Sequence, residues 1–125
     1  MRLMLACNAG MSTSMVVAQM EESALRQGKN YIIWAVDIDS VEDEIGNFDV
    51  LLIGPQIQYK LRTLKRLLED QAPVDIIDPV AYGCCDGQKV LQQAEKLLND
   101  FHERRNRAVS YTHLFIIQDY PSNHN

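Results

Sequence analysis

The sequence has few cysteines and no long apolar run, and each absence removes a class of protein. Its three cysteines include the adjacent pair Cys84 and Cys85, and an odd count with two neighbours does not fit a disulfide framework. Reduced thiols instead suit a cytoplasmic protein. No segment reaches the roughly 18–20 apolar residues that cross a bilayer. The apolar run before Cys7 is also far shorter than the about 7–15 residues of a signal peptide core. We therefore expect a cytoplasmic chain with no direct membrane insertion.

A dense block of basic residues is absent as well. The formal net charge is -5, and an acidic chain of this kind is a poor candidate for binding nucleic acid or an anionic membrane. The one basic cluster, Arg104, Arg105 and Arg107, is typical of a helix end. The three histidines have no cysteine or acid at metal-ligand spacing, so we expect no metal and no cofactor.

Short apolar runs alternate with longer helical patterns along the 125 residues, a length that suits one domain. The expected strands cover residues 2–6, 31–36, 50–53 and 74–77. The expected helices cover residues 12–27, 40–44, 57–70 and 88–101. This alternation predicts an α/β fold, a parallel sheet covered by helices on both faces. Ligands of such sheets bind beyond the carboxyl ends of the strands.

The alternating pattern does not continue into the last part of the chain. We expect a folded domain over residues 1–107 and a C-terminal tail over residues 108–125. The tail is expected to be flexible or to add an edge strand at residues 114–117, with a disordered end at residues 120–125.

A thiol stands where the first expected strand meets a helix. The loop there consists of Cys7, Asn8, Ala9, Gly10, Met11, Ser12, Thr13 and Ser14. Gly10 allows a tight turn, and the hydroxyl residues can cap the helix and leave backbone N–H groups facing the loop. Such N–H groups and the helix dipole bind phosphate and favour a thiolate. The spacing alone fits equally well a buried cysteine that merely ends a strand.

Three separate motifs resemble one protein family. The loop CNAGMSTS resembles the active-site loop of the IIB components of the lactose/cellobiose/chitobiose class of the bacterial sugar phosphotransferase system. Residues 54–59 resemble the family's GPQI-x-Y motif after the third strand, and residues 78–87 resemble its D-x-x-x-Y-G-x-x-D-G segment after the fourth. The resemblance covers about residues 1–100 and does not extend to the tail.

The resemblance implies both a fold and a reaction. The fold is a four-stranded parallel sheet with helices on both faces, similar to that of low-molecular-weight tyrosine phosphatases. Cys7 is implied to accept a phosphoryl group from a phosphohistidine of the IIA component. It then passes the group to a sugar, of the β-linked disaccharide class, that the IIC membrane permease transports. The chain is thereby identified as a protein phosphocysteine–sugar phosphotransferase that meets the membrane only through the permease.

Two alternatives stay open on the same scaffold. Tyrosine phosphatases and arsenate reductases of this fold have an arginine six residues after the cysteine, where this chain has Thr13. An arginine there would clamp the phosphoryl oxygens with two hydrogen bonds, so its absence favours a carrier over a phosphatase or arsenate reductase. The other alternative is a regulatory phospho-binding module.

Further residues near the expected strand ends are candidates for lining the site. Gln56 follows the third strand and can face the loop, or belong to an ordinary strand-to-helix turn. Tyr82 can donate its hydroxyl toward the loop or merely support it. Tyr59 is expected to pack in the interior, and Asp78 and Asp86 are expected to cap helices.

Overall fold

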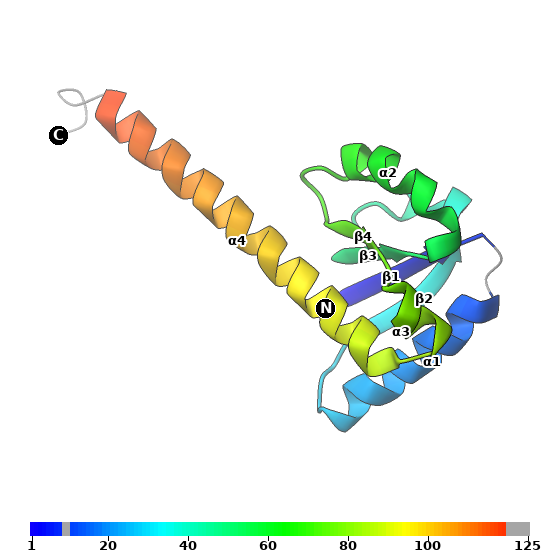
Figure 1. Ribbon diagram of the computed structural model, residues 1–125. Helices are drawn as coiled ribbons and strands as arrows, with labels where there is room; N and C mark the ends of the chain where they lie inside the picture. The colour runs from blue at the N-terminus through cyan, green and yellow to red at the C-terminus, as the bar shows by residue number, and fades with distance from the viewer. Residues whose placement is uncertain (9–10, 120–125) are drawn as a thin grey trace.

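The centre of the molecule is a sheet of four parallel strands (Figure 1). The computed structural model describes residues 1–8 and 11–119, with side chains at residues 1–8 and 13–108. The strands are β1 (Arg2–Cys7), β2 (Ile32–Asp37), β3 (Val50–Ile53) and β4 (Val74–Ile76), in the order β2-β1-β3-β4. The predicted parallel sheet is confirmed. Strand order reverses at the neighbours β1 and β3, and the carboxyl ends of such a pair form the usual ligand site of an open α/β sheet.

Helices cover both faces of this sheet. One face carries α1 (Met11–Arg26), α3 (Pro79–Gly83) and α4 (Gly87–Asp119). The other carries α2 (Leu61–Leu67), preceded by the 3-10 turns η1 (Ile38–Ser40), η2 (Glu42–Glu44) and η3 (Pro55–Lys60).

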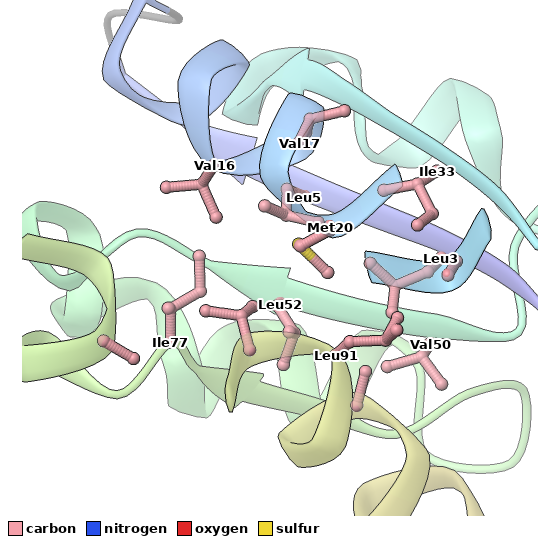
Figure 2. Packing of buried hydrophobic residues seen from close by; sticks show 14 residues of the cluster. Leu3, Leu5, Val16, Val17, Met20, Ile33, Val50, Leu52, Ile77 and Leu91 are labelled. Atoms are coloured by element: carbon pink, nitrogen blue, oxygen red, sulfur yellow. The ribbon is translucent and has the colours of Figure 1, made fainter. Parts of the chain in front are cut away.

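Side chains that alternate along β1 build the two cores. Leu3 and Leu5 pack with Met20 of α1 and Leu91 of α4 (Figure 2). Met4 and Ala6, which alternate with them along the strand, point to the opposite face and join the α2 cluster. This follows from the two-residue period of a strand. Because β1 is buried on both faces, its last residue, Cys7, lies at the carboxyl end of a central, covered strand.

The start of β2 is tied to α4 by polar contacts. Lys29 and the hydroxyl of Tyr31 both bind the carboxylate of Glu95, the latter at 2.6 Å. Partial burial and the hydrogen bond to Glu95 raise the pKa of Tyr31 to about 12. These contacts hold α4 against the end of the sheet opposite Cys7.

The C-terminal part of the chain differs from the prediction. Helix α4 continues without a break through residue 107 to Asp119, so the expected edge strand at residues 114–117 is wrong. The physical reason is that no glycine or proline follows Gly87 before Pro121, and nothing else in this segment forces a helix to end. Figure 1 shows α4 projecting from the domain. The expected disorder at residues 120–125 lies outside the described residues.

Removing residues 108–125 is expected to leave the domain folded. Phe101 is the last buried residue of α4 among those with described side chains, and residues 102–108 are exposed. Changes at exposed positions usually alter the free energy of unfolding by less than about 0.5 kcal/mol. The truncated chain should therefore keep its unfolding midpoint in a circular dichroism melt. Loss of the cooperative transition would show that this segment stabilises the domain.

Candidate functional site

Cys7 ends the central strand and lies beside the carboxyl end of β2. It is the last residue of β1, in register with Asp37, and only 5% of its surface is exposed. Asn8 forms an exposed bend after it, and α1 begins at Met11. The thiol therefore stands between a strand end and a helix N-terminus, as the sequence predicts. Ala9 and Gly10 lie outside the described residues.

The turn after β3 lies against Cys7. The Gly54 N–H donates to the Ala6 carbonyl at 2.9 Å, which brings the two strand ends together. A Cβ atom added at Gly54 would lie 3.5 Å from the Cys7 Cβ and 2.9 Å from Oε1 of Gln56. The carboxamide of Gln56 thus folds back over Gly54 at the edge of the cysteine site. Pattern reasoning missed Gly54, although a glycine between a strand and Pro55 is a recognisable sign of close backbone approach.

Thr13 has a buried hydroxyl that finds no partner among the described residues. It is fully buried, and its Oγ1 atom has no hydrogen bond within the described part of the chain. Leaving a buried polar group unsatisfied costs about 1–3 kcal/mol, so such a group calls for an explanation. Thr13 lies in the first turn of α1, where backbone N–H groups also lack helical acceptors. A hydroxyl donor and N–H donors therefore meet at the helix end that adjoins Cys7.

The remaining candidate residues are placed as follows. Tyr82 is half-buried on α3 and packs against the core cluster that α1 and α4 share. Ser14 is exposed on the first turn of α1, after Thr13. The structure brings Gln56 beside Cys7 and places Tyr82 on α3, against the core.

The expected interior position of Tyr59 is wrong, because 69% of it is exposed. Residues Pro55–Lys60 form a 3-10 turn with a kink at Ile57, so Tyr59 is not on the apolar stripe that the α-helical spacing suggested. The Lys60 ammonium lies 5.9 Å from the centre of its ring.

The two expected helix caps are confirmed. Asp78 accepts hydrogen bonds from the Val80 and Ala81 N–H groups at 2.9 and 3.2 Å. Asp86 accepts one from the Lys89 N–H at 3.2 Å. Both carboxylates satisfy N–H groups that a helix start leaves without acceptors, which gives each a structural role.

The described residues form neither a metal cluster nor a membrane span. Within that part of the chain, no three His, Cys, Asp or Glu side chains are grouped to hold a metal ion. None of its helices has both the length and the apolar character needed to cross a membrane.

Comparisons with known proteins agree with this architecture. The family described as "PTS system, Lactose/Cellobiose specific IIB subunit" matches residues 2–93. The oligo-beta-mannoside-specific EIIB component of Bacillus subtilis is 38% identical over 78% of this chain and 95% of its own length. The galactose-specific EIIB component of Lactococcus lactis is 43% identical over 76% of this chain and 94% of its own length.

A solved structure agrees as well. The cellobiose-specific phosphotransferase IIB component of Borrelia burgdorferi superposes with a TM-score of 0.68 at 35% identity, covering 80% of this chain and 93% of that protein. The family match spans the sheet and the Cys7 turn, and ends inside α4. The chain therefore belongs to the lactose/cellobiose-specific IIB subunits of the phosphotransferase system (PTS).

Proposed function

We propose that this protein is the phosphoryl carrier of a sugar uptake system and that Cys7 is the residue that carries the group. The donor is a phosphohistidine of a IIA protein, and the acceptor is a sugar bound by a IIC permease. The observation that supports this most is the site itself: a cysteine at a strand-to-helix junction, next to a helix start whose buried Thr13 hydroxyl has no partner among the described residues. The family supports a transferase role.

The proposed transfer has two balanced steps. In the first, the Cys7 thiolate attacks phosphorus, an S–P bond forms, the N–P bond of the donor histidine breaks, and the leaving imidazole takes up a proton from solvent. In the second, a sugar hydroxyl attacks phosphorus, the S–P bond breaks, and the hydroxyl proton passes to solvent. The carrier returns unchanged.

The first turn of α1 would stabilise the charge of the transferring group. Phosphoryl transfer is catalysed mainly by positioning and by donors aimed at the three non-bridging oxygens. The N–H groups of residues 11–13 at the start of α1 and the Thr13 hydroxyl are such donors. Gln56, which lies beside Cys7, can supply an amide N–H from the β3 side. These donors need no metal ion.

The proposed sugar is a β-linked disaccharide. Relatives of this chain are named for oligo-beta-mannoside and for cellobiose, both of which contain β-glycosidic links.

The direct test is labelling by a protein donor. The wild-type chain is incubated with a panel of lactose/cellobiose-class IIA proteins that carry radioactive phosphate on histidine. We expect the label to pass to Cys7, where mass spectrometry locates it, and to pass on to sugar when IIC-containing membranes are added. Sustained hydrolysis of an aryl phosphate without labelling by any IIA protein would instead indicate a phosphatase.

Thr13→Val is expected to slow phosphoryl labelling without lowering the free energy of unfolding. The change removes the unpartnered hydroxyl while keeping the shape, so the free protein should be as stable as the wild type or more stable by about 1 kcal/mol. The labelling rate should nevertheless fall about tenfold, because one donor to the phosphoryl oxygens is lost. Urea unfolding and rapid-quench labelling measure the two effects.

Thr13→Ser, which keeps the hydroxyl, is the matched control and should label at nearly the wild-type rate. An unchanged labelling rate in Thr13→Val would remove Thr13 from the phosphate site.

A further inference from the structure

Three large apolar side chains are exposed on the segments that follow the strands around Cys7. Met15, Tyr59 and Val80 are 63%, 69% and 70% exposed. They lie on α1, η3 and α3, which follow β1, β3 and β4 respectively. Because parallel strands end at one edge of the sheet, the three segments that carry these side chains begin at the edge that holds Cys7. Figure 1 shows the start of α1 and the segment α3 at the end of the domain away from the projecting part of α4.

Other exposed apolar residues lie elsewhere. Leu25 is near the end of α1, and Ile32 starts β2, so both belong to the opposite edge of the sheet. Single exposed apolar residues are normal, but a group around a functional site indicates a contact surface. Cys7 is 5% exposed, so a donor group can reach it only if the donor protein presses closely against this edge.

The charges beside the apolar group have opposite signs on the two sides of Cys7. Five acidic residues end or follow β2: Asp37, Asp39, Glu42, Asp43 and Glu44. On the other side, Lys60 and Arg62 follow Tyr59 after β3. The order β2-β1-β3 places Cys7 between the two groups. In the described part of the chain, neither Lys60 nor Arg62 forms an ion pair.

We propose that Met15, Tyr59 and Val80 form the docking surface for the phosphohistidine donor protein. This inference rests on the carrier function proposed above. The partner has an apolar face around its histidine, with acidic side chains that meet Lys60 and Arg62 and basic side chains that meet the acids after β2. Apolar contact excludes water from the transferring group. Because the charges on the two sides of Cys7 have opposite signs, they favour one orientation of the partner.

The apolar part of the docking surface is tested with the double variant Tyr59→Ala/Val80→Ala. Its labelling rate is measured at increasing concentrations of phosphorylated IIA protein, up to saturation. We expect the KM for the IIA protein to rise about tenfold, as truncation of central interface residues commonly does, with kcat changed less than about twofold. The matched control is Leu25→Ala/Ile32→Ala, which truncates equally exposed residues at the opposite edge and should leave KM unchanged.

The charged part is tested with Lys60→Glu/Arg62→Glu. At low ionic strength KM should rise about tenfold, and the rise should shrink in high salt, because exposed charges are screened. In all variants the rate at which iodoacetamide alkylates Cys7 should equal that of the wild type, which shows that the site itself is intact.

The outcomes separate the two proposals. If IIA protein labels the wild type and both sets of variants with the same KM, the docking surface is wrong and the carrier function stands. If no IIA protein of the panel labels the wild type, the carrier function is overturned, and the docking surface with it.

Discussion

The Cys7→Ser variant is expected to fold normally and to accept no phosphoryl group from a phosphorylated IIA protein. Serine nearly matches cysteine in shape, and the position is buried at a strand end, so the sheet should be unaffected. A serine hydroxyl without an adjacent base stays protonated near neutral pH, whereas a thiol forms a strongly nucleophilic thiolate. We expect the labelling rate to fall by about a thousandfold or more, measured with radioactive IIA protein beside a thermal unfolding control.

The other two cysteines provide the comparison. Cys84 is exposed and Cys85 is half-buried in the turn between α3 and α4, and no expected phosphate loop adjoins them. Cys84→Ser and Cys85→Ser should keep labelling. Label that persists in Cys7→Ser and disappears in one of these variants would move the carrier residue to that turn.

The strand positions could be predicted because the buried parallel strands have a simple signature. Residues 50–53 form an unbroken apolar run, and every residue of β3 is buried. A strand covered by helices on both faces must be apolar at each position. The position of Cys7 follows from the same pattern, since the strand before it and the helix after it are both clear.

Elements that depend on short-range geometry were harder to predict. Helix α3 has only five residues, too few for an apolar period to show, and it was not expected. The kink at Ile57 (φ -117°, ψ 28°) lies inside η3, which precedes α2, although the sequence suggests one continuous helix. These features arise from local hydrogen bonds, such as the Asp78 cap, which hydrophobic periodicity does not reveal.

The part of the candidate site that follows β1 could be predicted from the sequence. The part that follows β3 could be predicted only incompletely. A helix start after a cysteine is visible in the sequence, so the loop with Thr13 could be proposed. The contact among Gly54, Gln56 and Cys7 joins residues about fifty positions apart, and its geometry depends on which strands are neighbours. The buried state of Thr13 is likewise a result of packing, which no local pattern encodes.

Gly87→Ala is expected to destabilise the fold strongly, because α1 and α4 touch at this glycine. A Cβ atom at Gly87 would lie 2.3 Å from the carbonyl carbon of Gln19 and 2.5 Å from the backbone nitrogen of Met20. Both are backbone atoms inside a helix, so they cannot rotate aside as a flexible side chain would. The helices must separate and loosen the core around Met20 and Leu91. We expect a loss of about 2–4 kcal/mol, or a midpoint lowered by roughly 10 °C.

Gly83→Ala is the matched control for this loss, since it adds the same methyl group at a helical glycine with open space around it. It should leave the midpoint unchanged or raise it slightly, through the smaller entropy of the unfolded chain. Equal midpoints for both variants would mean that α1 and α4 can part at no cost.

The two helices also connect stability to function, because Gln19 and Thr13 lie on the same α1. If α4 positions α1, phosphoryl labelling of Gly87→Ala should be slowed even at temperatures where the variant is fully folded, while Gly83→Ala labels normally.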